Sequence, residues 1–125
     1  FWALALGPSK TLLQSKMLFR GTVDRCEIHL RDVFMFACLA NASSLLVAHN
    51  HPGRDSAPSD DDLSITERLL IAGDILEIPV IDHLIISGDS YCSVSAALKK
   101  KSRPKGRWKT SRAKTMREAA AKGPT

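Results

Sequence analysis

Hydrophobic residues near the start of the chain are interrupted by turn-forming residues in the manner of a β-hairpin. Phe1–Leu6 is almost wholly apolar and predicts a buried strand, and Gly7-Pro8-Ser9-Lys10 is a turn-forming sequence. Thr11–Phe19 predicts a second strand that pairs with the first. Because strand side chains alternate, Lys16 and Met17 point to opposite faces of that strand.

Two longer segments carry apolar residues at helical spacing. Leu30–Ala40 is apolar nearly all round, so it predicts a well-buried helix that Asn41 caps at its C-terminal end. Ser59–Leu76 predicts a second helix whose charged residues face water. Its apolar stripe consists of Leu63, Ile65, Leu69, Leu70, Ala72 and Leu76.

Three short apolar stretches complete the pattern. Ser44–Ala48 is continuous and apolar, which is typical of a central strand in a sheet covered on both faces. Val80–Ile86 predicts another buried strand, although two polar residues interrupt it. The turn Ser87-Gly88-Asp89-Ser90 leads into a returning strand at Tyr91–Val94.

The order strand, strand, helix, strand, helix, strand, strand predicts an α/β fold with a mixed sheet sandwiched by helices. With 125 residues, 44% of them apolar, the chain is long enough for one domain with a single core. We expect that domain to span residues 1–98. Beyond Leu98 the composition becomes polar and basic, which predicts a disordered C-terminal tail over residues 99–125.

The net charge of +5 conceals two opposite parts. Residues 1–98 carry seven Lys/Arg and twelve Asp/Glu, whereas residues 99–125 carry eleven Lys/Arg and one acid. A tail of this charge, with Trp108 between Arg107 and Lys109, predicts salt-dependent contacts with DNA through its phosphates and through base stacking. The alternative is a solubilising extension without a partner.

Cysteine usage and hydropathy indicate the cellular compartment in which the protein is expected. Cys26, Cys38 and Cys92 are odd in number, widely spaced and without a CxxC pair. They predict buried thiols in a reducing cytoplasm rather than a cysteine metal site. No apolar run approaches the roughly 18 residues of a membrane span, so we expect a cytoplasmic protein without a membrane partner.

Two histidines follow the central apolar strand. His49 and His51 are spaced i, i+2, so in extended backbone both imidazoles point the same way and can reach one metal ion. Two histidines on a loop also occur by chance. A Pro/Gly/Ser-rich loop follows and leads to Ser59, with Asp62 three residues further on.

The pair Ser59 and Asp62 has two interpretations. Ser-x-x-Asp at a helix start is close to a capping box, in which the two side chains satisfy free backbone N–H groups. Alternatively, the loop folds the helix start back toward the strand end, and Asp62 joins His49 and His51. Two imidazoles and a carboxylate are the ligand types of a catalytic zinc site, which leaves a fourth position open.

The full spacing His-x-His-x(7)-Ser-x(2)-Asp resembles the signature of the JAMM (MPN-like) zinc metalloproteases, and within that group the chain most resembles the RadC-like proteins. The likeness covers about residues 1–95 and implies the JAMM/MPN fold, a cytidine-deaminase-like architecture. RadC-like proteins usually carry a helix-hairpin-helix region before this domain, so we expect a truncated chain or a short variant. The sequence segments that carry the resemblance are Phe19-Arg20-Gly21-Thr22, Ala48-His49-Asn50-His51-Pro52, Asp55 to Pro58-Ser59, Thr66-Glu67-Arg68-Leu69 with Ala72-Gly73, and Ile78-Pro79-Val80-Ile81-Asp82-His83-Leu84-Ile85-Ile86.

The resemblance implies that His49, His51 and Asp62 bind Zn²⁺ and that Ser59 stabilises the oxyanion of a tetrahedral intermediate. The family chemistry is attack on a peptide or isopeptide carbonyl by a zinc-bound water whose pKa falls toward about 7. A peptide or protein is then the substrate. Because RadC-like proteins also carry a DNA-repair label, the alternative is an inactive zinc-binding module in protein or DNA contacts. Either form is compatible with an oligomer.

One position departs from the family pattern. JAMM enzymes use a glutamate on an earlier strand to bind and deprotonate the zinc-bound water, and here that position is Lys16. A protonated lysine cannot serve as a general base, and a cation beside Zn²⁺ is electrostatically unfavourable. Either Lys16 turns away, or Glu27 or Asp24 substitutes for the glutamate, or the site is inactive.

Three further polar residues each have more than one interpretation. Asp82 and His83 are either a hydrogen-bonded core pair or partners that orient a zinc-bound histidine. Arg54, on the loop between the ligands, is either solvated or a contact for a substrate carboxylate.

Overall fold

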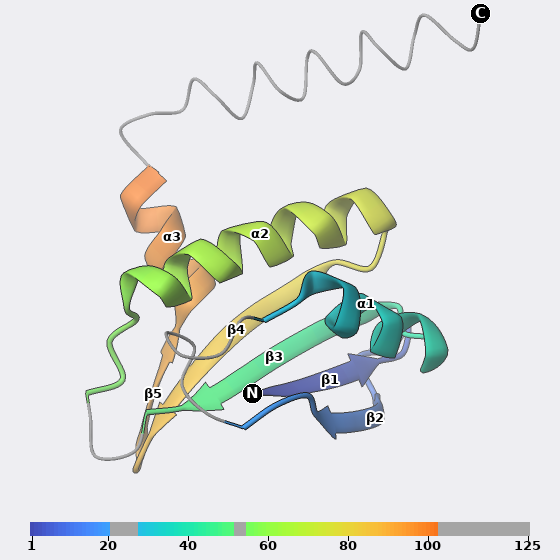
Figure 1. Cartoon of the computed structure of the whole chain (residues 1–125), viewed down its shortest axis with the longest axis horizontal. Helices are drawn as coiled ribbons and strands as arrows, with labels where there is room; N and C mark the ends of the chain where they lie inside the picture. Colours follow the sequence, from blue (N-terminus) through green and yellow to red (C-terminus); the bar gives the residue numbers. More distant parts are fainter. Residues whose placement is uncertain (21–27, 52–54, 103–125) are drawn as a thin grey trace, which may run out of the picture.

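The computed structural model describes residues 1–20, 28–51 and 55–102. Its elements confirm the predicted α/β class with a mixed sheet, and each of the seven predicted segments forms an element of the predicted type. Figure 1 shows them in chain order: β1 (Trp2–Leu6), β2 (Leu12–Met17), α1 (Leu30–Leu39), β3 (Ser44–Asn50), α2 (Asp60–Leu76), β4 (Val80–Ser87), β5 (Ser90–Ser93) and α3 (Val94–Ser102).

The described strands form one sheet in the order β2-β1-β3-β4-β5. Strand β1 pairs antiparallel with both β2 and β3, and β4 pairs antiparallel with β5. The pair β3–β4 is parallel and therefore needs a crossover, which α2 supplies between the end of β3 and the start of β4. Strand β3 is the central strand, as predicted. The expectation that both of its faces are covered is not met, because Leu46 and Ala48 on one face are only half-buried.

Both predicted turns form. At the first, the backbone N–H of Gly7 donates to the carbonyl of Thr11 at 2.9 Å, and Lys10 adopts a left-handed conformation with φ of 63°. At the second, between β4 and β5, Gly88 has φ of 55°, a conformation that glycine adopts without a steric penalty.

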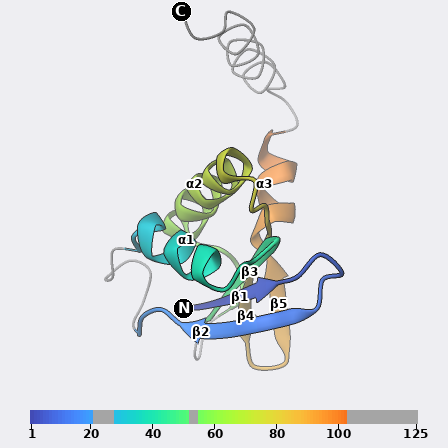
Figure 2. The ribbon, with the colours of Figure 1, turned by 90° about the vertical axis from the view of Figure 1, so that its right-hand side faces the viewer.

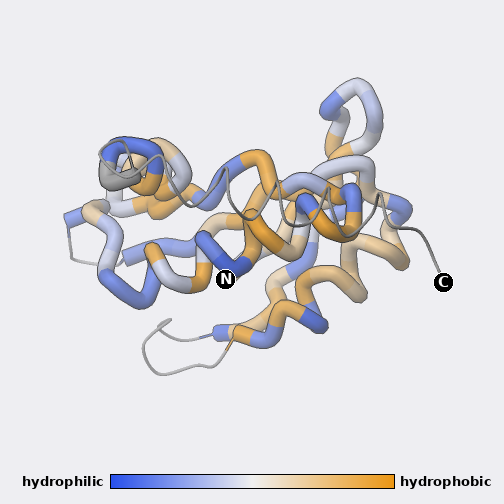
Figure 3. The backbone as a smooth tube through the Cα atoms, turned by 90° about the horizontal axis from the view of Figure 1, so that it is seen from above, coloured by the Kyte–Doolittle hydropathy of each residue, from blue (hydrophilic) through white to orange (hydrophobic). Residues whose placement is uncertain are grey.

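Helices α1 and α2 lie side by side on one face of the sheet, as Figure 2 shows. Helix α1 packs against β1, α2 packs against β4, and α3 contacts both α2 and β4. Along β3, Leu45 and Val47 point toward the helices and are fully buried, whereas Leu46 and Ala48 point to the opposite face and are half-buried. Hydrophobic and hydrophilic segments alternate along the helices in Figure 3, because each helix has one covered side.

Helix α1 buries one stripe, which corrects the prediction of a helix buried nearly all round. Val33 and Phe34 are buried, but Met35 is 53% and Leu39 84% exposed. A helix in the outer layer of a single sheet necessarily turns one side to solvent. Asn41 follows the C-cap with φ of 55°, the left-handed conformation that ends many helices, so its predicted capping role is confirmed.

The buried stripe of α2 differs in part from the predicted one. Leu76, predicted to face the core, is 49% exposed because it lies in the last turn, beyond the part of α2 that packs on β4. Two polar side chains lie in the stripe instead. The buried residues of α2 are Asp62, Ile65, Thr66, Leu69 and Gly73.

Helix α3 was not predicted. It begins at Val94, which was assigned to the returning strand, and it runs to Ser102, across the predicted domain boundary at Leu98. Alanine, leucine and lysine are good helix formers, so a basic composition does not by itself indicate disorder here. Residues 103–125, including Trp108, lie outside the described part of the chain.

The predicted burial of the cysteines is wrong for Cys38, which is exposed, and Cys92 is only half-buried. Both are free thiols, as predicted. Cys26 lies outside the described residues. Cys38 is on the side of α1 that faces away from the sheet, which hydropathy alone did not indicate. Among the described helices, none has the length and apolar character needed to cross a membrane.

Candidate metal centre

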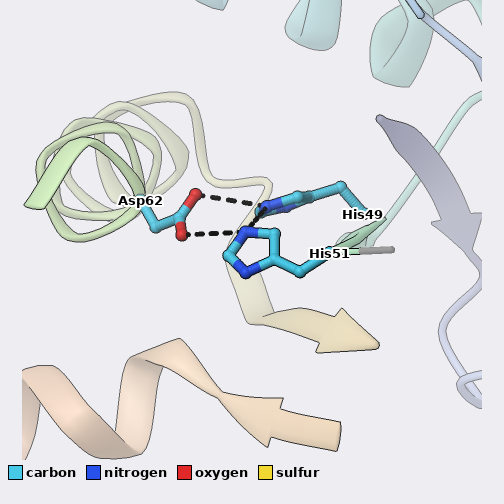
Figure 4. A group of neighbouring side chains, drawn as sticks. All are labelled: His49, His51 and Asp62. Carbon is cyan, nitrogen blue, oxygen red and sulfur yellow. Dashed lines mark hydrogen bonds and ion pairs between the residues drawn. The ribbon is translucent and has the colours of Figure 1, made fainter. Parts of the chain in front are cut away.

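The two histidines come from the end of the central strand. His49 is the penultimate residue of β3, and His51 follows the strand with its backbone N–H donating to the carbonyl of Ile86 at 2.9 Å. This bond keeps the chain extended beside β4, so both imidazoles project to the same side. Their Nε2 atoms lie 2.9 Å apart, and Figure 4 shows them converging.

Asp62 reaches the histidines from the first turn of α2. Its Oδ1 lies 3.2 Å from His49 Nε2, and its Oδ2 lies 3.3 Å from His51 Nε2 (Figure 4). Asp62 also forms the capping box, since its Oδ2 accepts from the Ser59 backbone N–H at 2.8 Å. The two interpretations of this pair are therefore compatible, because the capping box holds the carboxylate against the histidines.

The three side chains form a group that can hold a metal ion. Within the described part of the chain, His49, His51 and Asp62 are the cluster whose ligand atoms all lie within 4.8 Å of one another. Asp62 is fully buried, and within the described residues its Oδ1 has no polar partner besides the His49 contact at 3.2 Å. A buried anionic oxygen with so little compensation is costly, and a bound cation would offset that cost.

The charge state of Asp62 suits this role. Burial raises the pKa of its carboxyl, but interactions with His49 and with the backbone and hydroxyl of Ser59 outweigh burial. The net effect holds the pKa of Asp62 well below its ordinary value, so the side chain is an anion at neutral pH.

Asp82 and His83 do not form an isolated core pair. They point to opposite faces of β4, and His83 Nε2 lies 2.7 Å from His49 Nδ1 in a fully buried position. Burial and the neighbouring His49 lower the pKa of His83 to about 4, so its imidazole is neutral at neutral pH. Asp82 accepts hydrogen bonds from the His83 backbone N–H at 2.7 Å, from the Ser93 hydroxyl at 2.6 Å and from the Ser95 backbone N–H at the start of α3.

An aromatic wall closes one side of the centre. The Phe1 ring stacks on Phe19 with centroids 5.1 Å apart. Its centroid is 6.2 Å from that of His49 and 5.7 Å from that of His83. Apolar rings exclude water from this side and so strengthen the electrostatic interactions of the buried polar groups.

Ser59 stands at the N-cap of α2 and is exposed. Its Oγ accepts from the Asp62 backbone N–H at 3.1 Å. That bond uses the oxygen as an acceptor and leaves the hydroxyl hydrogen to donate elsewhere. The catalytic role implied for Ser59 remains a prediction.

Lys16 is exposed on the edge strand β2, where it pairs with Ala3 of β1. Ala3 faces the helices and is fully buried, so Lys16 points to the helix-covered side of the sheet but at its margin. Among the described residues, no further His, Cys, Asp or Glu joins the metal cluster. Asp24 and Glu27, the suggested substitutes, lie outside the described residues, as does Arg54.

Thr66 is a site residue that the sequence analysis missed. It is fully buried in α2, and its Oγ1 lies 2.6 Å from His83 Nδ1 and 2.6 Å from the Asp62 carbonyl. A signal was present, because a polar residue four positions after Asp62 lies on the same helix face. Its contact with β4 depends on tertiary packing.

The chain is similar in sequence to known proteins. The profile of the RadC-like JAB domain matches residues 1–101. A UPF0758 protein of Thermotoga maritima is 46% identical over 90 residues, which make up 72% of this chain and 40% of that protein. A UPF0758 protein of Desulforudis audaxviator is 38% identical over 94 residues, or 75% of this chain and 41% of that protein. The UPF0758 protein YeeS of Escherichia coli is 41% identical over 93 residues, which make up 74% of this chain and 63% of that protein.

The chain spans about two fifths of the length of the first two relatives and less than two thirds of YeeS. The match to the family profile nevertheless covers every described element except the last residue of α3, and it includes all three residues of the metal cluster. The chain belongs to the RadC-like JAB-domain family.

Proposed function

We propose that this domain is a zinc-dependent hydrolase of the JAB type, acting on peptide or isopeptide bonds, with activity weakened by Lys16. The observation that carries the proposal is the convergence of two imidazole nitrogens and one buried carboxylate from β3 and α2. His49, His51 and Asp62 would hold the ion. When bound, zinc supplies a Lewis acid for a carbonyl and lowers the pKa of water.

The donor set favours zinc over harder cations. Two imidazoles with one carboxylate are typical zinc ligands, whereas Mg²⁺ and Ca²⁺ prefer oxygen. Tetrahedral zinc with ligands at about 2.0–2.1 Å separates those ligands from one another by about 3.4 Å. The two Nε2 atoms are 2.9 Å apart, and the two oxygens of Asp62 lie 3.2 Å from His49 and 3.3 Å from His51. With one ligand atom from each residue, all three atoms lie within 4.8 Å of one another, so a rotation of the Asp62 carboxylate would bring one oxygen to the ion.

The remaining chemistry needs an oxyanion donor and a general base. The Ser59 hydroxyl, fixed at the N-cap beside Asp62, is the donor that the geometry supports. At the position where the family places its glutamate, Lys16 supplies no base. We therefore expect metal binding to be intact and peptide hydrolysis to be slow. The alternative is a zinc-binding module without catalysis.

Metal analysis tests the first half of the proposal. The purified protein should contain about one zinc ion per chain, and His51→Ala should lose it, because two ligands from distant elements hold a metal poorly. An equal metal content in both proteins would contradict the assignment of the site.

The second half is tested by Lys16→Glu, with Lys16→Gln as the control for loss of the positive charge. Hydrolysis of an isopeptide-linked substrate and of a fluorogenic peptide library should rise at least about 100-fold in Lys16→Glu, the usual range for a positioned base. The glutamine variant should stay near wild type. Robust wild-type hydrolysis would show that Lys16 does not impair the domain.

The basic tail supports a second candidate function, DNA contact. Residues 99–125 carry eleven Lys/Arg and one acid, which suits binding to phosphates without sequence preference. Because α3 extends to Ser102, the tail is best removed after that residue. Loss of tail residues 103–125 should weaken DNA binding at low salt; unchanged affinity would refute this function.

A further inference from the structure

A buried line of hydrogen bonds leads from the backbone of α2 to the metal cluster. The Thr66 Oγ1 lies 2.6 Å from the carbonyl oxygen of Asp62 and 2.6 Å from His83 Nδ1. His83 Nε2 in turn lies 2.7 Å from His49 Nδ1. Thr66 and His83 are both fully buried, and they belong to α2 and β4 respectively.

The direction of each bond follows from counting hydrogens. Each of these three short contacts needs one hydrogen between its two atoms, because facing lone pairs at this distance repel. A carbonyl oxygen can only accept, so the single hydroxyl hydrogen of Thr66 goes to Asp62. Thr66 Oγ1 must then accept from His83 Nδ1–H.

The same count of hydrogens fixes the tautomers of both imidazoles. A neutral imidazole carries one hydrogen, and that of His83 is on Nδ1, so its Nε2 is an acceptor. The hydrogen in the contact between His83 and His49 therefore belongs to His49 Nδ1. In the neutral form of His49, Nε2 is left with the lone pair, and this is the atom that faces Asp62 and His51. A second proton on Nε2, held by the Asp62 carboxylate, would have to leave before an ion binds.

We propose that Thr66 and His83 are positioning residues that hold His49 in the tautomer whose Nε2 lone pair is presented to the metal cluster. As a ligand, a histidine needs that lone pair, and a partner at its other nitrogen fixes the ring orientation and raises ligand basicity. The consequence for metal affinity rests on the proposed zinc site. The assignment of the His49 tautomer does not rest on the zinc site, because the tautomer is set before any ion binds.

The hydrogen bond to the Asp62 carbonyl gives Thr66 a second role in the cluster. Thr66 links the helix turn that carries Asp62 to the histidine that orients His49. Asp62 and His49, two of the three cluster residues, are thus connected through atoms that would not themselves bind the ion. A shift of α2 relative to β4 would break the Thr66 to His83 contact and release the His49 ring.

Nitrogen NMR of the metal-free protein tests the tautomer directly, at an alkaline pH where both imidazoles are neutral. In wild type, His49 and His83 should each show a protonated Nδ1 and an unprotonated Nε2. A protonated Nε2 on His49 would overturn the proposal, whatever the protein does with zinc.

Two matched variants test the link to metal affinity. Thr66→Val keeps the shape of the side chain and removes the hydroxyl, whereas Thr66→Ser keeps the hydroxyl. In a chelator competition with Zn²⁺, Thr66→Val should bind roughly 10 to 100-fold more weakly, and Thr66→Ser should stay close to wild type. Cobalt absorption spectra should change in the valine variant only.

The outcomes separate this inference from the proposed function. If wild type binds no zinc, the function fails while the NMR result still decides the tautomer. If Thr66→Val binds zinc as wild type does and keeps the His49 tautomer, the positioning role is refuted. Should Thr66→Val not fold, His83→Gln, whose amide oxygen can accept from His49 Nδ1–H, should retain more zinc affinity than His83→Leu; equal loss in both would count against the role.

Discussion

The two faces of the sheet differ in what covers them, although both are apolar. On the helix-covered face of β3, Leu45 and Val47 are fully buried and the metal cluster continues the same row of side chains at His49. On the opposite face, Leu46 and Ala48 are half-buried and Trp2 is 46% exposed. A continuous apolar strand thus does not imply equal burial on both sides; the covered face carries both the core and the site.

Replacing neighbouring leucines on β3 should show this difference most strongly. Leu45→Ala should lower the free energy of unfolding by about 2–5 kcal/mol, because it opens a cavity under the helices. Leu46→Ala should cost only about 1 kcal/mol, since the side chain is half-buried on the opposite face. Urea denaturation measures both. Equal losses would show that the two faces are equally covered in solution.

A smaller effect is expected where α2 closes onto β4. A Cβ added at Gly73 would lie 2.7 Å from the Ile78 carbonyl oxygen and 3.1 Å from the Val80 nitrogen, both backbone atoms that cannot easily move. Gly73→Ala should therefore lower the free energy of unfolding by about 1–3 kcal/mol.

Gly88 offers the matched control, because a Cβ there would meet nothing within 4 Å. Its positive φ favours asparagine over alanine, so Gly88→Asn should be nearly neutral in thermal denaturation. If Gly73→Ala were as stable as Gly88→Asn, the close approach of α2 to β4 would be wrong.

The smallest effect is expected on the open face. Ile86 follows the buried Ile85 on β4 and is 43% exposed, pointing away from the helices. Ile86→Lys should change the free energy of unfolding by only about 0.5 kcal/mol, as most surface substitutions do. A loss that grows with protein concentration would instead reveal that this face is buried by a second copy.

Local sequence signals predicted much of the fold. The turn residues, the short apolar runs and the Ser59 cap act within a few residues, so they were sufficient to locate strands and helix ends. Helix α3 was missed because Val94 and the lysines after it fit both a strand end and a disordered tail. The error on Leu39 arose because hydropathy does not say which side of a helix faces the sheet.

The metal cluster was predictable because its residues are close in sequence. His49, His51 and Asp62 fall within fourteen consecutive positions, and the extended backbone and the helix cap each impose a direction on the side chains. The open question about His83 could not be answered in this way. It lies 34 residues from His49, so their contact depends on which strand pairs with β3.

Local spacing and residue identity were sufficient to predict the types of seven elements, the three candidate ligands, and a lysine at the position where the family resemblance places a glutamate. The three-dimensional packing was needed to show which face of the sheet is covered and to bring Thr66 and His83 to the candidate ligands. The parallel pairing of β3 with β4, which α2 connects, brings these distant residues into hydrogen-bonding distance. Such contacts depend on strand order and helix packing, which no short stretch of the chain encodes.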